Sequence, residues 1–428
     1  MREMKESGVE WIGKIPKEWH ITQTRRLFRN EKNIVGDAAD EYERLALTLK
    51  GVIKRSKNDS EGLQPEKFEG YQILRQNELV FKMIDLENVN TSRVGLSPYT
   101  GLVSPAYIVL KNDSDDNRYE YYWFMSMYYN EVFNHLGGDG VRSALNVKDM
   151  LSLPIPNISK IQKKMLADYL DAKCSKIDEI IEKQQAIIEK LKEYKLSIIT
   201  EAVTKGLNPD VEMKDSGYEY IGDIPNYWNV CRLRNYGSAQ NGISKGGEYF
   251  GTGFPFVSYG DVYRNYVLPN RLDGLINTTE EERKKYSVEE GDIFFTRTSE
   301  TIEEVGFSAV CNKTIPNATY AGFVIRVRPF IDMLTLGFAK YYFRSKHLRV
   351  YFAKEMNLVT RASLGQDLLK SMPLLVPPKD EQCKIAEYLD KKCNLIDSNI
   401  YEKGRLIIKL QEYKKSLIYE VVTGKKEV

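Results

Sequence analysis

The chain of 428 residues is 42% hydrophobic and 29% charged, and its formal net charge is +2. This length predicts at least two domains, and the hydrophobic fraction is ordinary for packed cores. A nearly balanced charge neither demands nor excludes a nucleic-acid partner, so the local placement of Lys and Arg has to decide. The first residues lack the apolar core of a signal peptide, and no apolar run approaches the roughly 18 residues of a membrane span. We therefore expect a soluble, cytoplasmic protein with no membrane partner.

The N-terminal segment recurs in the middle of the chain. Glu3–Trp19 reads EMKESGVEWIGKIPKEW and Glu212–Trp228 reads EMKDSGYEYIGDIPNYW, at an offset of 209. Gly and Pro at matching positions indicate turns and extended segments. We expect Trp19 and Trp228 to anchor two separate cores.

A variable domain follows each copy of this segment. In the first variable domain, the sequence predicts short strands at 45–49, 78–81 and 106–110 and a tyrosine-rich helix at 119–132. The second predicts a strand in the run GDIFFTRTS, another strand at 323–327 and an aromatic helix at 336–352. Short strands separated by turn residues and accompanied by helices favour an α+β fold with a curved sheet and flanking helices.

Each variable domain closes on a matched element. Residues 141–145 read VRSAL and residues 360–364 read TRASL, at an offset of 219, and a proline-containing segment follows each. Ser159 and Asp380 are then candidate N-caps for the long segments that come next.

Those long segments are 166–204 and 385–423, which also align at an offset of 219 (Tyr169 onto Tyr388). Their apolar residues recur at alternating steps of three and four, which is the pattern of a coiled coil. We predict that helix pairing involves Leu170, Ile177, Ile181, Ile188, Leu191, Leu389, Ile396, Ile400, Ile407 and Leu410. Polar residues interrupt the pattern at Gln184 and Lys195 and again at Lys403 and Lys414, and such residues fix register at a cost in stability. The alternative is two amphipathic helices that pack separately on their own domains.

The two offsets together describe a tandem duplication, domain–helix–domain–helix. The expected boundaries are 1–157 for a first recognition domain, 158–206 for a central long helix, 207–376 for a second recognition domain and 377–428 for a C-terminal long helix. The expected fold is thus two α+β domains separated by two long helices in an antiparallel coiled coil, with pseudo-two-fold repetition.

Sequence motifs that are typical of catalysis are absent. The chain has no Gly-x-x-x-x-Gly-Lys-Ser/Thr phosphate loop, no Gly-x-Gly-x-x-Gly fingerprint and no Asn-Pro-Pro-aromatic signature of an adenine methyltransferase. Five cysteines and three histidines show no metal-ligand spacing, and the cysteines are expected to be free thiols. The acidic residues near Pro209 are too closely spaced for a nuclease core. We expect no catalytic, cofactor or metal site on this chain.

Binding chemistry is the remaining possibility. Basic, hydroxyl and aromatic residues gather in the predicted loops, and such side chains can contact phosphates and base edges. The candidate DNA-binding residues are Lys82, Arg93, Arg142, Tyr259, Arg297, Thr298 and Arg361. Polar loops can equally be solvated surface, and Arg142 and Arg361 can equally form structural salt bridges where domain meets helix.

Taken together, these motifs resemble the specificity subunit of Type I restriction–modification enzymes. The resemblance covers the full length and rests on five features: the repeated SG-x-E-[WY]-IG-x-IP-x-x-W segment, GDIFFTRTS, the Arg142/Arg361 element, the helix start PPKDEQCKIAEYLD and the helix ends ITEAVTKG and IYEVVTGK. The first helix start, ISKIQKKMLADYLD, lacks the Pro-Pro and Glu-Gln of the second.

The resemblance implies a non-catalytic subunit with two target recognition domains, each reading one half of a split sequence in double-stranded DNA. The paired helices would act as a spacer and as the docking surface for modification subunits. Those subunits would carry S-adenosylmethionine and flip the target adenine, while restriction subunits would add ATP- and Mg-dependent translocation and cleavage. Two alternatives remain: a coiled-coil adaptor without a DNA role, and part of a self-contained restriction–methyltransferase enzyme.

Overall fold

A computed structural model describes residues 2–57, 67–83, 93–136, 144–299, 305–355 and 362–428. The chain divides into two compact units, and each contains a part of both long helices. Unit 1 comprises residues 1–184 and 405–428, and unit 2 comprises residues 185–404. The sequence-based boundaries treated the helices as separate segments, whereas the compact units divide each helix between them.

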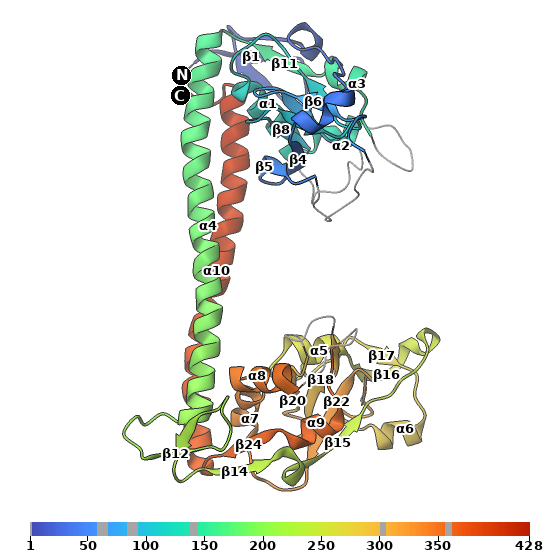
Figure 1. The fold of residues 1–428 in the computed structure, drawn as a ribbon, viewed down its shortest axis with the longest axis vertical. Coiled ribbons are helices and arrows are strands. Elements are labelled where there is room, and N and C mark those ends of the chain that lie inside the picture. The colour runs from blue at the N-terminus through green and yellow to red at the C-terminus, as the bar shows by residue number, and fades with distance from the viewer. Residues whose placement is uncertain (1, 58–66, 84–92, 137–143, 300–304, 356–361) are drawn as a thin grey trace. The chain divides into compact units, whose positions relative to one another are not determined.

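Unit 1 combines small sheets with three short helices and the two long-helix segments (Figure 1). Its strands pair in the orders β5-β4-β9-β6, β10-β7-β8, β1-β2 and β11-β3. The strands are β1 (Met4–Glu6), β2 (Lys14–Pro16), β3 (His20–Gln23), β4 (Arg44–Thr48), β5 (Gly51–Arg55), β6 (Gln72–Leu74), β7 (Leu79–Phe81), β8 (Val94–Leu96), β9 (Gly101–Val103), β10 (Ile108–Leu110) and β11 (Pro154–Asn157). The helices are α1 (Arg118–Tyr129), α2 (Val132–Leu136) and α3 (Val147–Ser152).

Unit 2 repeats this plan with additional strands. Its main sheet has the order β15-β22-β18-β20, and smaller sheets pair as β17-β16-β21, β12-β13, β14-β24 and β19-β23. The strands are β12 (Met213–Asp215), β13 (Asp223–Pro225), β14 (Asn229–Arg232), β15 (Gly237–Asn241), β16 (Phe250–Val257), β17 (Leu275–Ile276), β18 (Ile293–Thr296), β19 (Thr298–Ser299), β20 (Ser308–Val310), β21 (Thr319–Tyr320), β22 (Val324–Pro329), β23 (Ala362–Ser363) and β24 (Pro373–Val376). The helices are α5 (Tyr259–Arg264), α6 (Glu280–Lys285), α7 (Leu336–Tyr342), α8 (Lys346–Glu355) and α9 (Gln366–Ser371).

The central strands of the two units correspond at an offset of 214. Leu79 pairs with Leu96 in unit 1, and Ile293 pairs with Val310 in unit 2. The turn before each central strand needs a left-handed residue, which is Asn77 (φ 67°) in unit 1 and Gly291 (φ 92°) in unit 2. Asn and Gly are the residues that adopt this conformation most readily, so different residue types produce the same turn.

Two predicted helices are interrupted in the structure. The segment predicted as one helix at 119–132 is split into α1 and α2, because Glu131 between them adopts φ 55°. The segment predicted at 336–352 is split into α7 and α8, and the buried Ser345 hydroxyl in the break donates to the Tyr342 carbonyl at 2.6 Å. Local hydrogen bonds of this kind compete with the helix ladder.

The long helices are α4 (Lys160–Lys205) and α10 (Lys379–Val422). Ser159 caps α4 as predicted, since the Gln162 backbone N–H donates to its hydroxyl at 3.3 Å. The expectation for Asp380 is wrong, because α10 already begins at Lys379 and the backbone N–H of Gln382 donates to the Pro378 carbonyl. A proline before the first helical residue starts the helix here, and Asp380 lies in its first turn, where a carboxylate favours the helix dipole.

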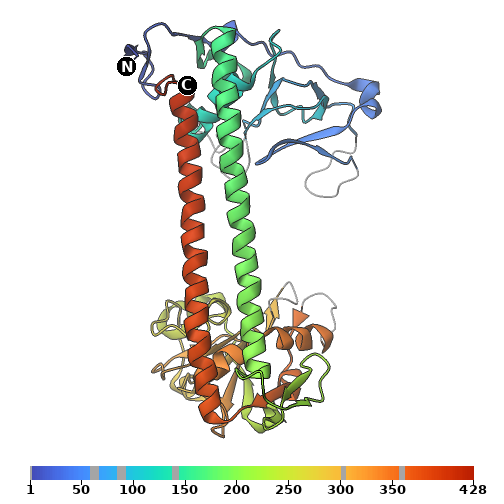
Figure 2. The same cartoon turned by 90° about the vertical axis from the view of Figure 1, so that its left-hand side faces the viewer.

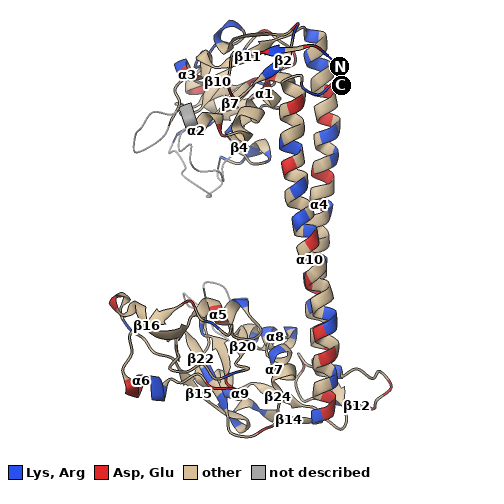
Figure 3. Ribbon diagram, turned by 180° about the vertical axis from the view of Figure 1, so that it is seen from behind, with Lys and Arg blue, Asp and Glu red and all other residues tan. Residues whose placement is uncertain are grey.

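Within each unit the α4 and α10 segments run antiparallel and side by side (Figures 1 and 2). Lysine and arginine alternate with acidic residues along both (Figure 3). In unit 1 the Lys414 ammonium lies 2.6 Å from the Asp178 carboxylate, and in unit 2 Lys195 lies 2.6 Å from Asp397. These four residues are repeat equivalents at the offset of 219. The polar positions Lys195 and Lys414 therefore form the same cross-helix ion pair in each unit.

Other tertiary contacts recur at the same offset. The Trp123 indole N–H donates to the Pro154 carbonyl at 3.0 Å in unit 1, and the Tyr342 hydroxyl donates to the Pro373 carbonyl at 2.9 Å in unit 2. Each contact fastens the aromatic helix to the last strand of its unit. The predicted duplicated α+β architecture with long paired helices is confirmed at the level of individual hydrogen bonds.

A candidate nucleic-acid interface

In unit 2 the candidate residues lie at the end of the central strand β18. The Gly306 backbone N–H donates to the Thr296 carbonyl at 2.9 Å, and the Thr296 N–H donates to the Phe307 carbonyl at 2.8 Å. Directly after Thr296, the Arg297 carbonyl accepts from the Leu364 N–H at 2.7 Å. The chain on both sides of residues 300–304 is thus fixed next to the chain that follows residues 356–361. We call this arrangement the strand-end base of unit 2.

A short two-stranded ribbon extends this base. Thr298 pairs with Ser363 and Ser299 with Ala362 in the antiparallel β19–β23 pair. The Arg297 and Thr298 side chains are half-buried there. Two described segments that are far apart in sequence are therefore hydrogen bonded to each other here, and rigid scaffolds of this kind commonly hold binding surfaces.

Arg344, which is buried, and Arg349, which is half-buried, stabilise the strand-end base of unit 2 through hydrogen bonds to backbone carbonyls. The Arg349 guanidinium donates to the carbonyls of Val305 and Gly306. Arg344 donates to the Ser308 carbonyl at 2.6 Å and to carbonyls at the end of α5 at 2.6 to 3.0 Å. Burial lowers the pKa of Arg349 to about 9 and that of Arg344 to about 10. Such groups remain cationic at neutral pH and satisfy carbonyls that have no strand partner.

Unit 1 contains the same strand-end base. The Lys82 N–H donates to the Arg93 carbonyl at 3.0 Å, and the Leu145 N–H donates to the Met83 carbonyl at 3.0 Å. These residues correspond to Thr296, Phe307, Leu364 and Arg297 of unit 2 at offsets of 214 and 219. The chain on both sides of residues 84–92 is therefore fixed next to the chain that follows residues 137–143.

The sequence-predicted residues of unit 1 occupy different environments. Lys82 is half-buried at the base, whereas Arg93 is only 2% exposed and donates to the Asn134 side chain at 3.2 Å. This hydrogen bond links the strand-end base of unit 1 to α2. Arg142 and Arg361 lie outside the described residues.

Tyr259 begins α5 in unit 2 and stacks on Tyr263, with ring centroids 5.9 Å apart at an interplanar angle of 17°. Tyr263 in turn contacts Phe307 at 5.0 Å. The Tyr259 hydroxyl is buried and has no hydrogen-bond partner within the described part of the chain. The structure therefore joins Tyr259 to the strand-end base through a row of rings that the sequence did not predict.

The predicted helix-pairing residues divide by exposure. Five are buried, and the other five are half-buried. The buried ones are Leu170, Ile177, Ile181, Leu389 and Ile396; the half-buried ones are Ile188, Leu191, Ile400, Ile407 and Leu410. The buried positions lie where the long helices pack against the body of their own unit, so both alternatives weighed from the sequence describe part of the arrangement.

Sequence reasoning missed Arg344 and Arg349 as positioning residues. Both belong to the segment 344–349, which reads RSKHLR between two aromatic stretches. Two arginines in an otherwise buried aromatic layer were the available signal, because a buried guanidinium requires several acceptors. The sequence could not identify those acceptors, since they are backbone carbonyls of distant loops.

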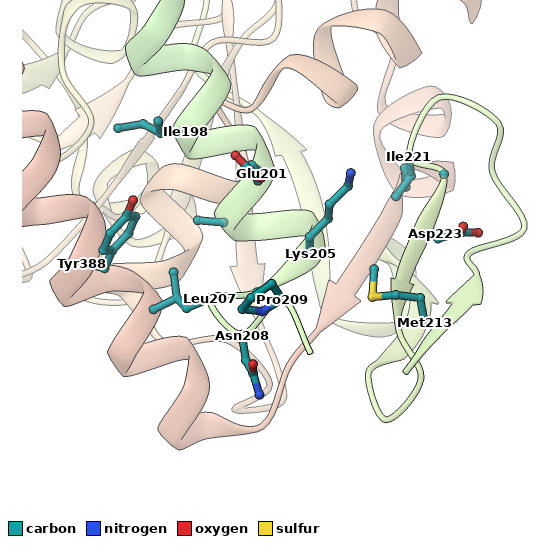
Figure 4. Close-up of a pocket in the computed structure, with 13 residues that line it drawn as sticks. Ile198, Glu201, Lys205, Leu207, Asn208, Pro209, Met213, Ile221, Asp223 and Tyr388 are labelled. Carbon is teal, nitrogen blue, oxygen red and sulfur yellow. The ribbon is translucent and has the colours of Figure 1, made fainter. Parts of the chain in front are cut away.

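A further cavity of unit 2 lies at the end of α4. It has a volume of about 790 Å³. Figure 4 shows Glu201 and Lys205 on α4, with Tyr388 on the side of α10 and Met213 and Asp223 on the side of the β12–β13 hairpin.

Within the described residues no group of three or more His, Cys, Asp or Glu side chains could hold a metal ion. The same residues include no helix long and apolar enough to cross a membrane.

Two repeated α+β units, each with a strand-end base beside cationic side chains, define a protein with two candidate binding surfaces. Residues 228–409 match the Type I restriction modification DNA specificity domain. This part of the chain is therefore similar to the DNA specificity domain of Type I restriction–modification systems, which agrees with the resemblance found in the sequence.

Individual relatives agree with this assignment. The chain is 24% identical over 313 residues to the EcoKI specificity subunit of Escherichia coli K12, covering 70% of this chain and 63% of that protein. It is 21% identical over 290 residues to the EcoBI specificity subunit of Escherichia coli, covering 66% and 60%. The matched region thus spans less than two thirds of either relative.

A solved chain from a study of assembly and conformational transition of the type I R-M system has the same fold. The TM-score is 0.69 at 14% identity, over 95% of this chain and 98% of that one.

Proposed function

We propose that this chain is the non-catalytic specificity subunit of a Type I restriction–modification complex. Each unit recognises one half of a bipartite site in double-stranded DNA, and the helices dock modification and restriction subunits. The observation that carries the proposal is the strand-end base, which occurs in both units with equivalent hydrogen bonds and lies, in unit 2, inside the matched DNA specificity domain.

DNA contacts are assigned to the side chains at and beside the two strand-end bases. Arg297 and Thr298 are half-buried beside the β19–β23 ribbon, and Lys82 is half-buried at the base of unit 1. Such side chains supply phosphate contacts with salt-dependent affinity and hydrogen bonds to base edges. Arg142, Arg361 and Tyr259 complete the proposed set. Arg93 contacts DNA only if its hydrogen bond with Asn134 rearranges; otherwise its role is to stabilise the strand-end base of unit 1.

The modification subunits are proposed to dock on exposed apolar residues of the long helices. In unit 2, Ile187 and Tyr194 are 37% and 53% exposed, and in unit 1 their repeat equivalents Leu406 and Tyr413 are 41% and 53% exposed. Each pair is seven residues apart, which is the spacing of one face of a helix in a coiled coil. Exposed apolar residues in a repeated pattern favour contact with another helix.

Cofactors are assigned to the partners. S-adenosylmethionine would bind the modification subunit, and ATP and Mg²⁺ would bind the restriction subunit. This chain's own part is to hold the duplex in one register, so that the partner reaches a chosen adenine.

The test is selection from a pool of random duplexes by the full chain together with its modification subunit. Enrichment of a bipartite motif is expected. A stable complex that enriches no sequence would favour the adaptor without a DNA role, and methyl transfer by the purified chain alone would favour a self-contained enzyme. Arg297→Met should weaken the motif half read by unit 2, whereas Lys313→Met, an exposed change beyond the opposite end of β20, serves as the matched control.

A further inference from the structure

Unit 1 contains a cavity of about 490 Å³ between α1 and the segments of α4 and α10. Its wall mixes aromatic, apolar and charged groups. The residues that matter here are Tyr122, Met125, Tyr129, Cys174, Asp178 and Lys414. The base and the helix pairing described above do not account for an open space at this place.

The equivalent place in unit 2 is filled by the side chain of Tyr266. Its ring lies 5.2 Å from the Lys195 ammonium, 4.6 Å from the Arg344 guanidinium and 5.6 Å from the Tyr341 ring. At the repeat offset of 219, Tyr341 corresponds to Tyr122, Arg344 to Met125 and Lys195 to Lys414. All three counterparts line the cavity of unit 1. Unit 2 therefore displays which group fits this type of cavity, namely a phenol ring beside a lysine and a tyrosine.

Tyr266 reaches its place as part of an extended segment. The Val310 N–H of β20 donates to the Tyr266 carbonyl at 3.0 Å, and the Leu268 N–H donates to the Val310 carbonyl at 2.9 Å. In unit 1 the counterpart of Val310 is Leu96 at the edge of the sheet β10-β7-β8. Among the described strands, β8 pairs with β7 alone. The residue of unit 1 that corresponds to Val310 is thus Leu96, and the backbone of an edge strand at such a position can accept an extended peptide.

The charge around the cavity selects among possible occupants. Four carboxylates line it, from Asp171, Asp178, Glu179 and Glu182, against one lysine. Asp171 and Asp178 are satisfied by Arg118 and Lys414, and Glu179 pairs with Lys183. Glu182 forms no ion pair with any described residue. This surplus disfavours a phosphate or a nucleic acid and favours a cation next to the ring.

We propose that unit 1 binds an extended segment of a partner polypeptide, which inserts an aromatic side chain into this cavity and places a basic side chain near Glu182. The proposal goes beyond DNA recognition and does not depend on it. Unit 2 has the same site occupied by its own chain, so the two units offer a partner different surfaces despite their common fold.

Small probes test the chemistry on the full chain by titration calorimetry or protein-observed NMR. Tyramine carries a phenol and an ammonium, 4-methylphenol carries the phenol alone, and 4-hydroxyphenylacetate carries a phenol and a carboxylate. Tyramine should bind at least fivefold more tightly than 4-hydroxyphenylacetate, with 4-methylphenol between them. Equal binding of tyramine and 4-hydroxyphenylacetate would overturn the charge argument, and binding of neither phenol would overturn the cavity assignment.

Matched variants locate the site. Ser175 is exposed and lines the cavity, so Ser175→Trp should fill it and abolish tyramine binding. Its repeat equivalent Asn394 is exposed in unit 2, and Asn394→Trp should leave binding unchanged. Tyr266→Ala should open a second site and raise the stoichiometry from one to two. Unaltered binding in Ser175→Trp, or one site in a folded Tyr266→Ala protein, would contradict the equivalence of the two places.

A peptide probe tests whether the occupant of the cavity is a polypeptide or a small molecule. The segment Arg264–Leu268, RNYVL, is the chain's own example of a basic residue beside the inserted tyrosine. Its acetylated and amidated form should bind unit 1 more tightly than tyramine, because backbone pairing with β8 adds to the ring contact, and RNAVL should lose this binding. Tighter binding of tyramine than of RNYVL would overturn the polypeptide as the occupant.

Discussion

Substitution of Arg349 by Met separates positioning of the interface from contact with DNA. Arg349 donates two hydrogen bonds to the carbonyls of Val305 and Gly306, and its guanidinium lies 4.9 Å from the Phe307 ring and 5.1 Å from the Phe352 ring. Methionine keeps the apolar stem that packs on these rings but removes both donors.

The expected cost follows from those two bonds. A hydrogen bond from a charged donor contributes about 1.5–3 kcal/mol, and the two are not additive because a buried guanidinium is itself costly to desolvate. We expect Arg349→Met to lower the free energy of unfolding by about 2 kcal/mol in urea titrations. Because the base is then less ordered, affinity for the duplex should fall roughly tenfold, which corresponds to about 1.4 kcal/mol.

The salt dependence of binding distinguishes the two roles. A residue that contacts phosphate lowers the slope of log K against log[salt] by about one when it is removed. Arg349→Met should leave that slope unchanged, whereas Arg297→Met should reduce it. Fluorescence anisotropy with a labelled duplex at several salt concentrations measures both quantities. A changed slope in Arg349→Met, or unchanged affinity in a measurably destabilised variant, would refute the positioning role.

Three further predictions concern the helices and the titrating groups. One heptad inserted into both long helices, after Gln184 and before Arg405, should lengthen the gap between the half-sites and leave both half-sites unaltered in a duplex selection; altered bases with a fixed gap would argue against the spacer. Replacement of Tyr194 and its equivalent Tyr413 by Glu should weaken association with the modification subunit at least tenfold by sedimentation, while duplex binding by the chain alone persists. Burial raises the pKa of Tyr121 to about 12 and that of Cys174 to about 11, as it does for many other tyrosines. Above pH 9 the unfolded chain therefore releases protons that the folded chain retains, and the free energy of unfolding should fall by up to about 1.4 kcal/mol per pH unit for each group. Urea titrations at pH 8 and pH 10.5 would show it, and equal stability at both would contradict the burial of these side chains.

The sequence was most informative where chemistry repeats. At the offset of 219, Tyr341 corresponds to Tyr122, and their hydroxyls donate to Asp390 and Asp171 at the same distance of 2.7 Å. Duplication predicts such contacts because equivalent residues in equivalent folds meet equivalent partners. The long helices were predictable because their apolar spacing is sustained over many turns.

The strand-end base was not predictable in the same way. It depends on single backbone hydrogen bonds, such as the one from Leu364 to Arg297, between segments that are more than sixty residues apart. The positions of Arg344 and Arg349 depend on carbonyls, and every residue carries a carbonyl, so sequence alone cannot identify the acceptor. The burial of Arg93 likewise follows from its contact with Asn134 and not from any local pattern.

The most direct measurement is a methylation map of a host genome in which this chain and its modification subunit are the only source of adenine methylation. The account predicts one bipartite motif with two fixed half-sites and a gap of constant length. It also predicts that replacing the recognition part of unit 2 changes one half-site and preserves the other. A single uninterrupted motif, or methylation whose sequence is unaffected by that replacement, would contradict the claim that each unit reads one half of the site.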